Sequence, residues 1–177
     1  MPKLIFLNGP GGCGKSTLAK RHADEFAPAL NLDVDRVRDL IGGWREDPSA
    51  AGLLARAIAL AGARTHLAAG HDVIVPQLVA RPQFPDQLQE LAGEMGVGYY
   101  EIVLMDSKPN ALRRFAERNR LVPGHQPVDE QELAAMYDRL LAFLATRPHA
   151  QLIASEHGQP DAAYRSLLAL LTAPFTR

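Results

Sequence analysis

Short apolar runs alternate along this chain with longer segments in which apolar residues recur every three or four positions. The runs lack polar alternation, which is typical of strands that are covered on both faces, and the longer segments have the spacing of amphipathic helices. The predicted strands span residues 3–8, 30–34, 72–75, 99–105 and 151–154. The predicted helices span residues 15–26, 35–41, 50–69, 82–95, 107–120 and 129–144, with a last one around 164–171.

This alternation predicts an α/β fold in which a five-stranded parallel sheet carries helices on both faces. In the long segment 50–69, the stripe expected to face the core consists of Leu54, Ile58, Ala61, Thr65 and Ala68. Ligands of such sheets bind beyond the carboxyl ends of the strands, so we expect the functional residues in the segments that follow each strand.

Composition places the chain among ordinary globular proteins. Its 177 residues, 47% hydrophobic and 22% charged, suffice for a single domain over residues 1–177. Lys and Arg total 19 and Asp and Glu total 20, so the net charge of −1 argues against binding of polymeric nucleic acid through phosphates. Neither a membrane span nor a signal peptide is predicted, and the one cysteine fits a reducing compartment. We therefore expect a cytoplasmic protein, monomeric or homodimeric.

The strongest chemical signal follows the first predicted strand. The sequence there matches G-x-x-x-x-G-K-[ST] in full, and a predicted helix comes next. Glycines let backbone amides wrap an anion, and the helix N-terminus adds partial positive charge. We expect Lys15 to reach the β- and γ-phosphates of ATP and Ser16 to hold Mg²⁺. The residues expected to contact the nucleotide are Gly9, Pro10, Gly11, Gly12, Cys13, Gly14, Lys15, Ser16 and Thr17.

A pair of carboxylates, Asp33 and Asp35, follows the second predicted strand. On an extended segment, side chains two positions apart point the same way, here toward the expected γ-phosphate. One carboxylate could take the proton of an acceptor hydroxyl while the other orients the water shell of Mg²⁺. Either could instead cap the next helix. Arg38 is expected to meet the acceptor or to pair with Asp35 or Asp39.

The phosphate loop and this Asp-x-x-Arg element together resemble the small P-loop kinases, a group that includes the polynucleotide kinase domain, the zeta toxins and the chloramphenicol- and tunicamycin-type phosphotransferases. In that group the second strand ends in an aspartate that serves as general base, often followed by an arginine. Asp35 and Arg38 match those positions. The resemblance covers most of the chain and implies a P-loop NTPase fold and ATP-dependent phosphorylation of a hydroxyl. It leaves the acceptor open.

The third predicted strand departs from a common P-loop pattern. Many P-loop proteins place an aspartate at the end of a central strand to hold the magnesium shell, but here the strand runs into Pro-Gln without a carboxylate. That task then falls to Asp33, while Gln77 could bind a water or the acceptor. Arg81 is expected at the acceptor pocket or on the surface, and Trp44 as a stacking wall for the acceptor or as a core residue.

Arginines gather where the resemblance implies a short helical lid. Residues 114–130, around the connection between the fifth and sixth predicted helices, occupy the position of the mobile lid of nucleoside-monophosphate-kinase-like proteins. A lid arginine neutralises charge on the transferring phosphoryl group, and a closed lid excludes water. Arg118 is the first candidate, followed by Arg114 and Arg120. Alternatively, these side chains interact with helix carbonyls.

These features favour an ATP-dependent kinase that acts on a small-molecule hydroxyl, such as a metabolite, a nucleoside-like compound or an antibiotic. The expected acceptor pocket is mostly apolar with a few polar groups. A second hypothesis is a polynucleotide 5′-hydroxyl kinase, which the near-neutral charge and the 6% of aromatic residues disfavour. A third is a non-catalytic regulator that binds a nucleotide.

Overall fold

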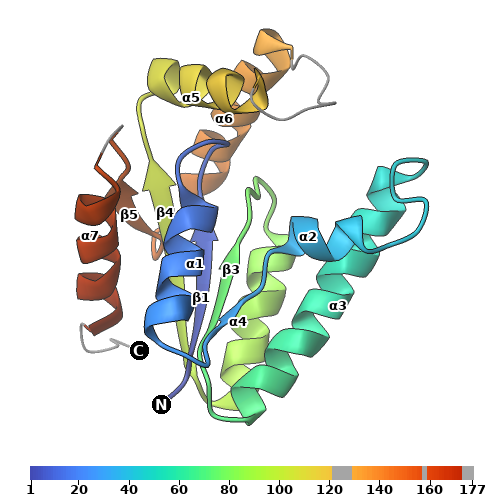
Figure 1. The fold of residues 1–177 in the computed structure, drawn as a ribbon, viewed down its shortest axis with the longest axis vertical. Coiled ribbons are helices and arrows are strands. Elements are labelled where there is room, and N and C mark those ends of the chain that lie inside the picture. Colours follow the sequence, from blue (N-terminus) through green and yellow to red (C-terminus); the bar gives the residue numbers. More distant parts are fainter. Residues whose placement is uncertain (121–128, 157–158, 173–177) are drawn as a thin grey trace.

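Parallel strands form the centre of the molecule, in the order β2-β3-β1-β4-β5 (Figure 1). The computed structural model describes residues 1–120, 129–156 and 159–172, without the side chains of residues 118–120. The strands are β1 Lys3–Asn8, β2 Leu30–Asn31, β3 Val73–Pro76, β4 Gly98–Met105 and β5 Gln151–Ala154. Every neighbouring pair among them is parallel. This confirms the predicted α/β fold.

The helices that connect these strands cover both faces of the sheet. They are α1 Lys15–Glu25, α2 Val34–Asp39, α3 Pro48–Ala68, α4 Gln83–Met95, α5 Lys108–Arg120, α6 Glu130–Leu144 and α7 Pro160–Thr172. In Figure 1, α1 and α7 lie on one side of the sheet and α3 and α4 on the other, while α5 and α6 stand beyond the carboxyl ends of the strands. Within the described residues, no helix is both long and apolar enough to cross a bilayer.

Alternate side chains of β1 point into two separate hydrophobic cores. Leu4 and Phe6 join one core with residues of α3 and α4, and Ile5 and Leu7 join the other with residues of α1 and α7. All four side chains are fully buried. Because both faces of the strand are covered, it has no polar alternation, which is the pattern from which the sequence predicts it.

Two elements differ from prediction. The strand expected over 30–34 ends at Asn31, because the Asp33 side chain caps a helix that already begins at Val34. The predicted core stripe of α3 is also wrong: the buried side of this helix is a row of small residues ending in a leucine. That row is Ala51, Ala55, Ala59, Ala63 and Leu67. The stripe through Leu54 and Ile58 faces outward.

The strand order brings three functional segments together at the carboxyl ends of the strands. β1 lies between β3 and β4, and β2 lies beside β3. Because the strands are parallel, the phosphate loop after β1, the Asp33 turn after β2 and Gln77 after β3 all leave the sheet at the same end (Figure 1). Ligands of open α/β sheets bind at this carboxyl end of the strands.

Candidate active site

The phosphate loop leads into α1 through a glycine that leaves the helix end uncapped. Gly14 is the N-cap residue, with φ of 96°, a left-handed conformation that favours glycine. Gly14 has no side chain that could cap the first amides of α1, and the first turn of the helix has no acidic residue. Helices α2, α3 and α6 begin instead with aspartate caps. The lack of a capping side chain and the positive end of the helix dipole therefore make this terminus suited to an external anion.

The loop is packed closely against α5. A Cβ atom added to Gly11 would lie 2.0 Å from Cδ2 of Phe115, so a side chain at this position would force the ring or the loop to move. The same helix passes Gly12, whose added Cβ would lie 3.1 Å from the carbonyl carbon of Arg114. The close contact between the phosphate loop and α5 thus depends on Gly11. This contact places the start of the predicted lid beside the loop.

The side chain of Lys15 lies over the phosphate loop, where it is predicted to contact the nucleotide. Its ammonium group donates hydrogen bonds to the carbonyl oxygens of Gly9 and Pro10, each at 2.8 Å, and lies 3.8 Å from Sγ of Cys13. An ammonium group held at this point can exchange loop carbonyls for phosphate oxygens. Cys13 itself is buried in the core that includes α1 and α7. Ser16 and Thr17 are exposed and line an open groove beside α1.

Asn8 is a site residue that sequence analysis missed. It is fully buried at the end of β1, and its Oδ1 accepts hydrogen bonds from the amides of Gly9 (2.8 Å) and Val79 (3.0 Å). Its Nδ2 donates to the carbonyl of Val79 at 2.8 Å. The side chain therefore fixes the start of the phosphate loop to the segment after β3. The available signal was a polar residue that ends an otherwise apolar strand.

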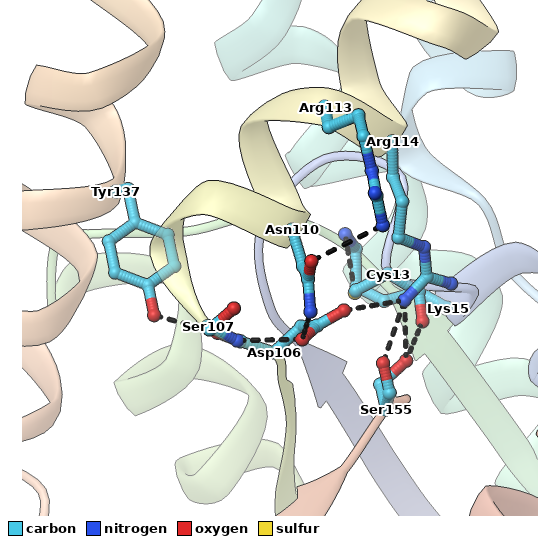
Figure 2. Close-up of polar contacts among 9 residues, drawn as sticks. All are labelled: Cys13, Lys15, Asp106, Ser107, Asn110, Arg113, Arg114, Tyr137 and Ser155. Atoms are coloured by element: carbon cyan, nitrogen blue, oxygen red, sulfur yellow. Dashed lines mark hydrogen bonds and ion pairs between the residues drawn. The ribbon is translucent and has the colours of Figure 1, made fainter. Parts of the chain in front are cut away.

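Asp106 and Ser155, which were also missed, join α5 to the phosphate loop through Arg114 (Figure 2). Nη1 of Arg114 donates to Oδ2 of Asp106 at 3.1 Å and to the carbonyl of Ser155 at 2.7 Å. The Ser155 hydroxyl donates to the carbonyl of Cys13. One network thus connects the ends of β4 and β5 with the loop. A carboxylate directly after a strand, the signal used for Asp33, would have identified Asp106.

The charge of Asp106 is well stabilised. Its burial alone would raise the carboxyl pKa, but hydrogen bonds from Asn110, from the Ser107 amide and from Arg114 outweigh burial and hold the pKa below 3.8. Figure 2 shows these groups converging on the carboxylate. Arg114 is therefore anchored as a partner of Asp106, and its side chain lies at the base of the predicted lid.

Asp33 caps a helix, which is the alternative that the sequence left open for this pair. Asp33 and Asp35 do not share the extended segment that was also expected: Asp33 is the N-cap of α2 and Asp35 is in its first turn. Oδ1 of Asp33 accepts from the amides of Asp35 (3.0 Å) and Arg36 (3.4 Å). Burial, with the neighbouring Asp35 charge, raises the pKa of Asp33 despite those bonds. The side chain of Asp35 is 59% exposed.

Arg38 connects Asp35 to Trp44. Its guanidinium lies 3.2 Å from Oδ1 of Asp35 and 3.3 Å from Oδ1 of Asp39, so the predicted ion pairs are both present. It also stacks on the half-buried ring of Trp44, with 4.3 Å between the guanidinium carbon and the ring centroid. Arg45 lies 4.6 Å from the same centroid. Asp35 is thus held in place by an arginine whose own position depends on an aromatic ring.

A family model for the AAA domain (AAA_33) matches residues 4–142, most of the chain and every site segment described above except the one around Ser155. This protein belongs to that family. The match confirms the resemblance to the small P-loop kinases. Searching the curated proteins gave no match.

Several solved structures share the fold over nearly the whole chain. A gluconokinase from Sinorhizobium meliloti 1021 has a TM-score of 0.61 at 17% identity, over 96% of this chain and 93% of that one. The tunicamycin resistance protein of Deinococcus radiodurans has 0.65 at 19%, over 97% and 96%. A candidate kinase from Chloroflexus aurantiacus has 0.70 at 18%, over 96% of both chains.

The remaining predicted site residues of this P-loop kinase fold are Gln77, Arg81, Arg118 and Arg120. Gln77 is buried after β3, and its Oε1 has no hydrogen-bond partner among the described residues. Arg81 is exposed before α4. Arg118 and Arg120 belong to α5, but their side chains lie outside the described residues, as does most of the predicted lid, over 121–128.

Proposed function

We propose that this protein is an ATP-dependent phosphotransferase that moves the γ-phosphoryl group to a hydroxyl of a small molecule. The observation that carries the proposal is the uncapped N-terminus of α1 behind a glycine cradle, with the ammonium group of Lys15 beside it. Such a terminus binds phosphate through backbone amides and the helix dipole. Family membership supports the same reading, since P-loop kinases of this type bind ATP.

The residues present also fit magnesium. The exposed Ser16 hydroxyl is at the start of α1, and Oδ2 of Asp33 takes no part in its capping bonds. Among the described residues, no group of three or more His, Cys, Asp or Glu side chains could hold an ion unaided. Mg²⁺ needs only one or two protein oxygens here, because phosphates and waters complete its shell. When bound, it would neutralise phosphate charge.

In the transfer itself, the acceptor oxygen bonds to the γ-phosphorus. The bond between the γ-phosphorus and the oxygen that bridges it to the β-phosphorus breaks, so that ADP leaves. We assign Asp35 as the group that accepts the hydroxyl proton, with Arg38 holding its carboxylate in place. Lys15 and the lid arginine Arg118 would stabilise charge on the moving group. Gln77, Arg81 and Trp44 are proposed to contact the acceptor, and Arg114 the nucleotide.

A small acceptor is favoured over a polynucleotide by the pairing of surface cations. The open groove beside Ser16 carries Lys20 and Arg21, but Lys20 pairs with Asp24 and Arg21 with Asp161. Cations that are already neutralised attract a nucleic-acid backbone weakly. We therefore place an oligonucleotide in the test panel as the competing acceptor.

The test is a screen for transfer of labelled γ-phosphate from ATP to sugar acids, nucleosides, hydroxyl-bearing antibiotics and a 5′-hydroxyl oligonucleotide. Using the best acceptor, Asp35→Asn is expected to lower kcat by about 10²–10⁴-fold with ATP affinity unchanged, because only the base is lost. Asp39→Asn is the matched control, since Asp39 is also exposed and also pairs with Arg38. Equal losses in both variants would reject Asp35 as the base. Tight ATP binding without transfer to any acceptor would favour the regulator hypothesis.

A further inference from the structure

Gln77 carries an amide oxygen that is buried and unpaired. The residue is 9% exposed, and Oε1 has no hydrogen-bond partner among the residues that the structure describes. A buried carbonyl oxygen in this state costs stability, because it has lost its hydrogen bonds to water and gained none from the protein. A protein that keeps such a cost commonly does so at a functional site, where a ligand supplies the missing partner.

The position of Gln77 is set by the sheet. Its backbone amide donates to the carbonyl of Leu7 at 3.1 Å, which extends the pairing of β3 with β1 to the point where the phosphate loop begins. Val75 and Val79, two positions before and after it, belong to the same core as Val34, the first residue of α2. Because β3 lies between β1 and β2, Gln77 lies between the start of the phosphate loop and the start of α2 (Figure 1).

A buried donor without a partner lies on the neighbouring helix. Arg38 follows Val34 by four residues, which is about one turn along α2. Its terminal nitrogens pair with Asp35 and Asp39, but its Nε is buried and has no hydrogen-bond partner within the described part of the chain. The guanidinium is also held by stacking on Trp44. One unpaired donor and one unpaired acceptor therefore belong to adjacent segments beside the phosphate loop.

A hydroxyl group satisfies both atoms, because it accepts one hydrogen bond and donates another. A carboxylate would suit Nε of Arg38 but would place a second acceptor against Oε1 of Gln77, and an ammonium group would do the reverse. Neither group would pair both atoms. The chemistry of the pair therefore points to an alcohol.

Given the proposed function, on which this step rests, we propose that the acceptor is a polyol. One hydroxyl reacts at Asp35, and a second accepts from Nε of Arg38 and donates to Oε1 of Gln77. Because the same guanidinium holds the carboxylate of Asp35, the two hydroxyls lie on neighbouring carbons of the acceptor. Gln77 is then a specificity-determining residue: it selects acceptors that carry a hydroxyl beside the reacting one.

The first test compares polyols with analogues that each lack one hydroxyl, such as uridine with 2′-deoxyuridine and 3′-deoxyuridine, and a hexonic acid with its monodeoxy forms. The wild type is expected to show a kcat/KM about 10–100-fold higher for the polyol, because the analogue leaves two buried groups unpaired. Gln77→Met is expected to reduce that ratio about 5–10-fold, since one neutral hydrogen bond is lost. Gln87→Met, at an exposed position of α4, should keep the wild-type ratio.

Two outcomes of this comparison overturn the polyol proposal and leave the kinase assignment standing. One is an equal kcat/KM of the wild type for a polyol and all of its deoxy analogues. The other is a Gln77→Met variant that loses activity on both compounds by the same factor, because an equal loss indicates a structural residue.

A stability measurement tests the buried oxygen without any acceptor. Methionine has a similar length but no carbonyl, so Gln77→Met is expected to raise the urea concentration at the midpoint of unfolding. Gln87→Met should leave this midpoint unchanged. An unchanged or lower midpoint in Gln77→Met would show that the oxygen is already paired in the folded protein, and would overturn the proposal. Because this measurement needs no phosphoryl transfer, it decides the matter even where no compound is phosphorylated, a result that by itself refutes the kinase assignment.

Discussion

Single atoms set the shape of the phosphate cradle. At Gly11, the missing Cβ leaves room for the ring of Phe115, so the loop and α5 touch where any other residue would separate them. At Gly14, a left-handed backbone turns the chain into α1 and leaves the helix amides without a side-chain cap. Both glycines shape the space in front of the N-terminus of α1, and neither has a side chain that could act as a functional group.

Replacing Gly11 with alanine should therefore weaken ATP binding without unfolding the protein. A Cβ atom 2.0 Å from Cδ2 of Phe115 is an overpacked contact, of the kind that costs about 1–3 kcal/mol. We expect a rise in the Kd for ATP, measured by calorimetry. The double variant Gly11→Ala/Phe115→Leu should recover part of the affinity, because it removes the ring. Gly93→Ala, at an exposed helix position with open space, should bind ATP like the wild type.

Among the elements, the strand ends carry the polar contacts that join the site together. Asn8 ends β1, Asp106 follows β4 and Ser155 follows β5, and each fixes the phosphate loop to a neighbouring segment or links it to α5. These contacts span residues far apart in sequence. An isolated helix or strand would not reveal them.

Asp106 gives a prediction about acid stability. Because its pKa is below 3.8 in the folded state, its contribution is present above pH 3.8 and is lost as pH falls through the folded-state pKa. Asp106→Asn should lower the free energy of unfolding at neutral pH by about 1.5–3 kcal/mol, the range for charged hydrogen bonds. Urea unfolding at several pH values checks this: the difference between wild type and variant should shrink in acid. A difference that is constant down to pH 2 would contradict the ion-pair account.

At the scale of the whole molecule, the sequence predicted the parallel sheet because apolar runs report strands buried on both faces. It also located the phosphate loop, whose function depends on local glycines and a neighbouring lysine. It failed for α3, since Leu54 and Ile58 give the same helical period whether they face the core or another surface. For Asp33 and Asp35 the expected extended segment was wrong and the alternative of a helix cap was confirmed, because the capping aspartate begins a helix where the apolar run suggested more strand.

In the proposed function, the N-terminus of α1 and the ammonium group of Lys15 together bind ATP. Calorimetric titration of the protein with ATP and magnesium measures this binding. We predict saturable binding that weakens about 10–100-fold in Lys15→Ala, since one or two charge-assisted hydrogen bonds are lost. Lys20→Ala, which removes an exposed lysine of the same helix, should bind like the wild type. Absence of binding, or equal affinity in Lys15→Ala, would contradict this role of α1 and Lys15.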